Sequence, residues 1–134
     1  MNQRIAQLAL VVRDYDEAID FYTRILRFDL VEDTVLSETK RWVLVRPQGG
    51  ETCLLLAKAA NEEQEKAIGN QSGGRVFLFL FTDDFERDHQ RLMEHNVTII
   101  RPPQDVDYGR VLVFSDLYGN LWDLIQPTEQ NSLM

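Results

Sequence analysis

Apolar residues along this chain fall in short runs separated by polar segments, and the first such run, residues 5–12, predicts a strand. Asp14 follows this run, with Glu17 three residues later, which is the spacing of a capping box at a helix start. Apolar residues then recur at intervals of three and four, as on one helical face: Ala18, Ile19, Tyr22, Ile25 and Leu26. Three more strands are predicted near residues 29–34, 41–45 and 52–57.

The second half of the chain repeats this pattern at an offset of 70 residues (77 − 7). Residues 7–18 superpose on 77–88, and residues 41–56 superpose without a gap on 111–126, which sets Cys53 on Asp123. Few paired positions are identical, so chance similarity between apolar strands is the alternative. The elements predicted in this half are a strand at 76–81, a helix at 85–95 anchored by Phe85, Leu92 and Met93, and strands at 98–101, 111–115 and 121–126.

Each half therefore has the order strand, helix and three strands. We predict a single domain over residues 1–134, made of module 1 (4–58), a polar linker (59–74) with a helical turn before its glycines, and module 2 (75–127). One helix covers only one face of a four-stranded sheet, so the other face must meet a second sheet. Two modules, in one chain or exchanged between two, would then face each other across a cavity.

Composition and charge limit the classes of partner and the cellular locations that we expect for this chain. The formal net charge is −8 and the pI about 4.7, with no basic run, which argues against nucleic acid. Cys53 is the single cysteine, so an internal disulfide and a cysteine-rich zinc cluster are excluded and a reducing, cytoplasmic location is expected. The N-terminal apolar run ends at Arg13 and is too short for a membrane span or a signal peptide.

Asp123 stands alone in an otherwise apolar strand, Leu-Trp-Asp-Leu-Ile. A buried carboxylate without partners costs several kcal/mol or takes up a proton. Four roles would satisfy it: a metal ligand, a general base, a group that fixes a bound molecule, or a residue that is hydrogen-bonded to its neighbours.

Two stretches, "LALVVRDYDEAIDFYTRILRFDL" and "VFSDLYGNLWDLIQ", make the chain resemble the vicinal oxygen chelate superfamily, which includes glyoxalase I, extradiol dioxygenases and bleomycin-binding proteins. The resemblance extends over residues 5–127. It implies an α+β fold in which two βαβββ modules form a cup-shaped, open, barrel-like mixed sheet with the helices outside. It also implies a homodimer.

In metal-dependent members of that superfamily, four positions on the cup floor hold a divalent metal. Carried onto this chain, they are Gln7, Cys53, Phe77 and Asp123, and a slip of two residues would put Leu55 in place of Cys53. Phenylalanine offers no donor atom, and the two histidines, His89 and His95, lie on the predicted second helix. We therefore expect no metal cofactor, which puts glyoxalase and dioxygenase activity in doubt.

The resulting hypothesis is a cup that binds a small, partly apolar organic molecule. The candidate ligand contacts, with Trp42 and Arg110 placed near the rim, are Gln7, Cys53, Phe77, Phe79, Trp42 and Arg110. Three alternatives remain. Gln7 and Asp123 could close a filled core, the protein could be a lyase or isomerase of the lactoylglutathione-lyase type with Asp123 as base or metal ligand, or a partner protein could fill the cup.

Overall fold

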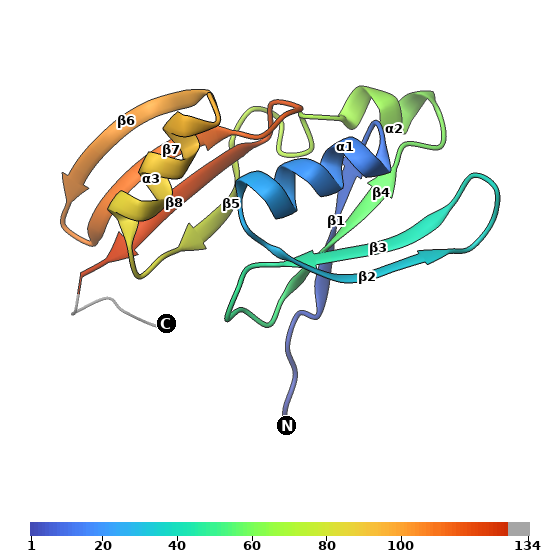
Figure 1. Cartoon of the computed structure of the whole chain (residues 1–134), viewed down its shortest axis with the longest axis horizontal. Helices are drawn as coiled ribbons and strands as arrows, with labels where there is room; N and C mark the ends of the chain where they lie inside the picture. The colour runs from blue at the N-terminus through green and yellow to red at the C-terminus, as the bar shows by residue number, and fades with distance from the viewer. Residues whose placement is uncertain (129–134) are drawn as a thin grey trace. The chain divides into compact units, whose positions relative to one another are not determined.

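The computed structural model describes residues 1–128, so the last six residues of the expected domain lie outside the described part. The chain divides into two compact units that meet in sequence at Ile68 and Gly69, inside the predicted linker. The short helix α2 (Glu62–Ala67) supplies the helical turn expected there, because Asn61 accepts a hydrogen bond from the Gln64 backbone N–H at 2.9 Å. Figure 1 shows the order of the elements along the chain.

The first unit has the predicted order of strand, helix and three strands. Its elements are β1 (Gln7–Val12), α1 (Tyr15–Asp20), the π-helical turn η1 (Phe21–Ile25), β2 (Asp29–Val35), β3 (Arg41–Arg46) and β4 (Cys53–Lys58). The strand order across the sheet is β1-β4-β3-β2, with β1 parallel to β4 and the other pairs antiparallel. Asp14 begins the helix as predicted, since its Oδ2 accepts a hydrogen bond from the Glu17 N–H at 2.9 Å.

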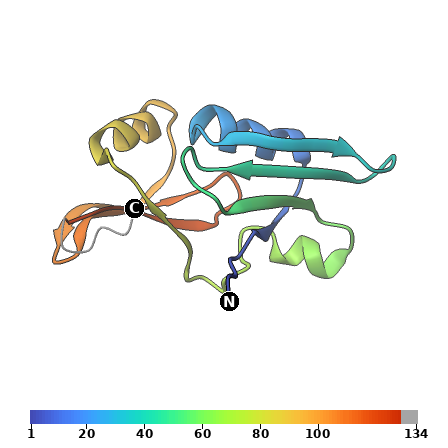
Figure 2. The same cartoon turned by 90° about the horizontal axis from the view of Figure 1, so that it is seen from below.

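The core of the first unit lies between its sheet and α1 with η1, which run along one face (Figure 2). Alternate strand residues turn toward the helix, so Leu54 and Leu56 are buried while Leu55 is half-buried. Tyr22 is fully buried and packs edge-on against Phe21 at 5.2 Å between ring centroids. The predicted apolar stripe therefore anchors this helix.

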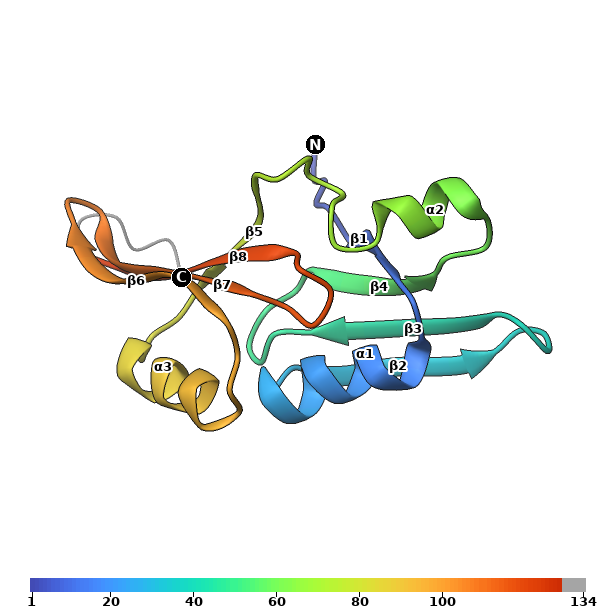
Figure 3. The same cartoon turned by 90° about the horizontal axis from the view of Figure 1, so that it is seen from above.

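The second unit repeats this order. Its elements are β5 (Val76–Phe81), α3 (Phe85–Glu94), β6 (Ile99–Val106), β7 (Gly109–Ser115) and β8 (Leu121–Pro127). The strand order is β5-β8-β7-β6, again with one parallel pair, and α3 lies on one side of this sheet (Figure 3). Of the three expected helix anchors, Phe85 and Leu92 are buried, but Met93 is 48% exposed and does not pack in the core.

Strand β6 is longer than predicted. The predicted strand ended at Arg101, and Pro102 and Pro103, which follow it, cannot donate a hydrogen bond to a neighbouring strand. β6 is an edge strand, however, and its pairing with β7 shifts register between Arg101 and Gln104. An edge position and a bulge together accommodate both prolines.

The α+β class and the two βαβββ units are thus confirmed. No helix among residues 1–128 is both long enough and apolar enough to cross a membrane.

Candidate functional site

Asp123 lies on β8, one of the two inner strands of the second sheet. Its register neighbours are Phe79 on β5 and Val113 on β7, and Val113 is in turn paired with Arg101 on β6. Residues directly opposite on neighbouring strands project from the same face of a sheet. We call this line of four residues, Phe79, Asp123, Val113 and Arg101, the Asp123 row.

The Asp123 row projects from the face that α3 does not cover. The neighbours of Asp123 along β8, Trp122 and Leu124, are 3% and 1% exposed. Trp122 stacks on Phe114 at 6.0 Å between ring centroids, on the α3 side of the sheet. Because side chains alternate along a strand, Asp123 points to the opposite side.

The Asp123 carboxyl has an oxygen that is not hydrogen-bonded. Oδ1 is buried and has no partner among residues 1–128. Burial raises the pKa of Asp123, and the positive charge of Arg101 opposes this shift. A buried oxygen without a partner is energetically costly, so it has a strong preference for any donor that reaches it.

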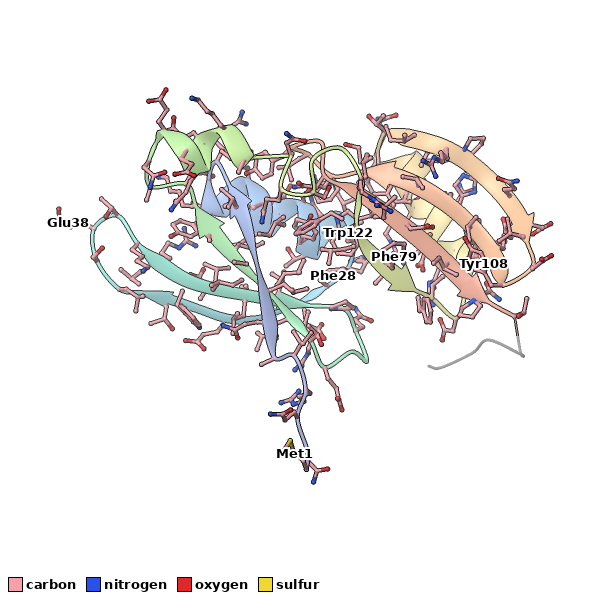
Figure 4. The ribbon with its side chains drawn as sticks, turned by 180° about the vertical axis from the view of Figure 1, so that it is seen from behind. Met1, Phe28, Glu38, Phe79, Tyr108 and Trp122 are labelled. Carbon is pink, nitrogen blue, oxygen red and sulfur yellow. The ribbon has the colours of Figure 1, made fainter. Side chains whose placement is uncertain are left out.

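An aromatic surface adjoins this carboxyl. Phe79, directly beside Asp123 in the register, is 63% exposed, and Phe81 is 39% exposed and paired with Ile125 on the same face. Figure 4 labels Phe79 on β5. The structure therefore brings together two of the predicted site residues, Asp123 and Phe79.

Phe77 is not opposite Asp123. The β5–β8 pairing shifts between Val76 and Leu78, so Phe77 lies at an irregularity of the strand. The resemblance placed Phe77 at a ligand position by its place on the first strand of the second module. Phe79 is the aromatic residue that the pairing places beside the carboxyl.

Gln7 and Cys53 are register partners of one another on β1 and β4 of the first unit, as expected of residues on one surface. Cys53 is 8% exposed. The match of Cys53 to Asp123 stays a prediction. In the alternative with a slip of two residues, Leu55, which pairs with Leu44, corresponds to Asp123, which pairs with Val113, at an offset of 68 (123 − 55).

Arg110 does not project from the face that carries Asp123, and Trp42 belongs to the other unit. Trp42 lies on β3 of the first unit, half-buried and paired with Thr34. Arg110 projects from the α3 side of the second sheet, with its guanidinium 5.2 Å from the centre of the Phe85 ring.

Arg110 is held there by two acids. Nη1 donates to Asp105 Oδ1 at 2.9 Å, and Nε lies 3.3 Å from Glu86 Oε1. These contacts raise the pKa of Arg110, the hydrogen bond with Asp105 most of all. A pocket of about 470 Å³ beside Arg110 is also lined by Phe85 and Gln126, so it opens on the α3 side and not on the Asp123 row.

A metal centre of the standard kind does not fit the residues present. Residues 1–128 contain no group of three or more His, Cys, Asp or Glu side chains placed to hold a metal ion. On the Asp123 row, Phe79 and Val113 offer no donor atom, and Arg101 carries a positive charge that opposes a cation.

The sequence analysis placed Arg101 at the end of a predicted strand but gave it no role, because its partner across the sheet depends on strand pairing. It also left the closing turn without a role. Asp116 Oδ1 accepts hydrogen bonds from the backbone N–H groups of Tyr118 and Asn120, both at 2.9 Å, and Oδ2 accepts one from Asn120 Nδ2 at 2.8 Å. The Asp-x-x-Gly-Asn stretch therefore builds the β7–β8 turn.

Comparison with known proteins supports a single family. The family profile described as Glyoxalase/Bleomycin resistance protein/Dioxygenase superfamily matches residues 4–124. A protein of Shewanella frigidimarina, described as uncharacterized, is 57% identical over 99% of this chain and 100% of its own length. The uncharacterized protein YurT of Bacillus subtilis is 30% identical over 92% of this chain and 98% of its own.

Solved structures similar to this chain include members of the same superfamily. TnmS3, described as an antibiotic binding protein from Streptomyces sp. CB03234, has a TM-score of 0.77 and 31% identity over 95% of this chain and 98% of its own. A superfamily member from Sphaerobacter thermophilus has a TM-score of 0.77 and 30% identity over 93% and 98% of the two chains.

Proposed function

The chain belongs to the Glyoxalase/Bleomycin resistance protein/Dioxygenase superfamily, and from this premise we propose that it binds a small, partly apolar organic molecule on the face of the second sheet that carries Phe79 and Asp123. One observation carries the proposal: the buried Oδ1 of Asp123 has no partner among residues 1–128, and an exposed aromatic ring lies beside it. A ligand that carries a donor group binds the Asp123 carboxyl and covers the ring.

Phe79 and Asp123 have different roles in this proposed binding. Phe79 offers a flat apolar surface on which an aromatic or aliphatic ring packs, while the carboxyl of Asp123 fixes the ligand's orientation. A hydrogen bond to a desolvated carboxylate is stronger than one formed in water. The description of TnmS3 as an antibiotic binding protein supports a ligand of antibiotic size.

Fluorescence of 8-anilinonaphthalene-1-sulfonate, with unlabelled aromatic antibiotics as competitors, tests the proposal. We expect saturable binding that weakens about tenfold in Phe79→Ala, since a large exposed ring is lost from the contact. Tyr108→Ala is the matched control, because Tyr108 is an aromatic residue of the same unit, 48% exposed, in the turn between β6 and β7 (Figure 4). Equal binding by the two variants would refute the site.

An enzyme is the second candidate, because burial raises the pKa of Asp123 and a raised pKa suits a general base. In this case Asp123 takes a proton from a bound substrate, as in a lyase or isomerase of the glyoxalase type. A screen with hemithioacetals, catechols and epoxide antibiotics tests it. Turnover that Asp123→Asn abolishes, with ligand affinity retained, would favour the enzyme over the binding protein.

A homodimer and a cytoplasmic location complete the proposal. The edge strand β2 and the residue after it expose apolar side chains that a second copy would cover, Val35 at 72% and Leu36 at 54%. Sedimentation at micromolar concentration tests the dimer, and a monomeric mass would count against it. Cell fractionation tests the location, for which the presence of a single cysteine in the sequence is the supporting observation.

A further inference from the structure

We infer that the ligand is a flat molecule with two functional ends, a hydrogen-bond donor that reaches Asp123 and an anionic or acceptor group that reaches Arg101. The inference rests on the proposed function and names the class of ligand for the same face. It depends on the order of the four residues across the second sheet.

The acid and the base of the Asp123 row are held apart by one strand. Asp123 and Arg101 are both register partners of Val113, one from each side. Neighbouring strands are about 4.8 Å apart, so the two backbones are separated by about 10 Å. Among residues 1–128 the two side chains form no ion pair with each other, and Arg101 is exposed.

The residues around this pair are apolar. Val113, between the two charges, is 4% exposed, and Phe79 extends the row on the other side of Asp123. An apolar floor with one acid and one base favours a molecule whose polar groups lie at its ends and whose middle is flat and apolar. A ligand with only one of these groups leaves the other charge without a partner.

The first unit offers an internal comparison. Its equivalent row is Ala9, Leu55, Leu44 and Glu32, by the pairings of β1, β4, β3 and β2. Leucine replaces the central acid and an acid replaces the terminal base, so this row cannot bind the same molecule. Glu32→Gln is therefore a control that changes the equivalent edge residue of the first unit.

The pocket beside Arg110 is a weaker candidate for the anionic end. Its arginine is already neutralised by Asp105 and Glu86, so an added anion would meet two carboxylates. Arg101 has no such acid within ion-pair distance among residues 1–128.

The test uses four probes of one shape: 6-hydroxy-2-naphthoate, 2-naphthoate, 2-naphthol and naphthalene. Affinities are measured by calorimetry or by ¹⁵N chemical-shift titration of the full chain at neutral pH. We expect 6-hydroxy-2-naphthoate to bind about tenfold more tightly than either single-group probe, because each end adds one charge-assisted hydrogen bond. Asp123→Leu should remove its advantage over 2-naphthoate, and Arg101→Gln its advantage over 2-naphthol.

The outcomes separate the two claims. Equal affinity for all four probes, or a preference that survives both substitutions, would overturn the two-ended ligand and leave the binding face in place. A preference that Glu32→Gln also removes would overturn it as well. The absence of saturable binding by any of the probes would overturn the binding face together with the inference. Chemical shifts that report folded variants make each result interpretable.

Discussion

The two units of this protein have the same strand order but different chemistry at the centre of their sheets. The row through the middle of the first sheet is Ala9, Leu55, Leu44 and Glu32, and that of the second is Phe79, Asp123, Val113 and Arg101. The apolar alternation that builds each sheet is kept in both. A sheet thus tolerates a change of chemistry on the face that no helix covers, while the helix side must remain apolar.

The helix-covered faces of the two sheets differ as well, and here the first unit has the larger set of buried side chains. The helical segment of the first unit and the loop after it bury many large side chains, which are Tyr15, Phe21, Tyr22, Ile25, Leu26 and Phe28. Helix α3 of the second unit buries Phe85 and Leu92. We infer that the first unit is the better packed and that the second carries the binding chemistry, and four predictions test this contrast.

The largest loss of stability is expected from substitutions of the buried helical residues that pack on each sheet. Tyr22 and Leu92 occupy equivalent helical positions, 70 residues apart (92 − 22), and are 0% and 3% exposed. Tyr22→Ala should lower the free energy of unfolding by about 4 kcal/mol, and Leu92→Ala by about 2.5 kcal/mol, because a larger buried ring leaves a larger cavity. Urea unfolding measures both. A greater loss in Leu92→Ala would contradict the contrast in packing.

The second largest loss of stability is expected in the turns that precede the last strand of each unit. Asp116→Ala leaves three donors of the β7–β8 turn without their acceptor, so we expect a loss of about 3 kcal/mol. In the first unit Gln48 donates from Nε2 to the Arg27 carbonyl at 2.9 Å on the exposed surface. Gln48→Ala should therefore cost about 0.5 kcal/mol or less. Similar losses in both variants would mean that the acidic turn has no special structural role.

Asp123→Leu, which gives the second row the residue of the first, should increase stability. Because burial raises the pKa of Asp123, the stability that its protonated form contributes is lost as the pH rises through the raised value. We expect a gain of about 1 kcal/mol at neutral pH, which disappears below the ordinary value of 3.8.

Leu55→Asp is the reciprocal change and should destabilise the protein most at neutral pH. Thermal unfolding from pH 3 to pH 8 (about these limits) covers the expected window. A stability difference that does not vary with pH would show that the Asp123 carboxyl is not desolvated.

The smallest loss of stability is expected from the substitution of two equivalent arginines, Arg41 and Arg110. Arg41 donates to Asp33 from Nε at 3.1 Å and from Nη2 at 2.7 Å, and its guanidinium lies 5.1 Å from the Tyr15 ring centroid. Arg110 has a similar arrangement in the second unit, but its partner acids are 74% and 80% exposed. Arg41→Met should cost about 1 kcal/mol, and Arg110→Met less, because solvent screens exposed pairs.

The pH dependence of the Arg41 effect has a defined sign. The Arg41 guanidinium lowers the pKa of Asp33, so the stability from this pair is present above the ordinary value of 3.8 and is lost as the pH falls through the lowered value. Arg41→Met should therefore resemble the unsubstituted protein in acid. Equal losses for both arginines at neutral pH would remove the distinction between the two contacts.

Much of the fold could be predicted because local patterns specify it. The cap at Asp14, the apolar stripe through Tyr22 and the alternation around Asp123 all depend on residues close in sequence. The candidate site was predicted only in part. Asp123 and Phe79 are brought together, whereas Arg110 projects from the other face, and Arg101 joins the row through its pairing with Val113.

The sequence by itself determined which segments form strands and helices and which residues share a face, since period and capping are local properties. The tertiary structure decided which residues lie across from one another. Register depends on turn lengths and bulges, and a slip of two residues keeps every side chain on its face while changing its neighbours. For this reason only strand pairing placed Phe79, Asp123 and Arg101 in one row.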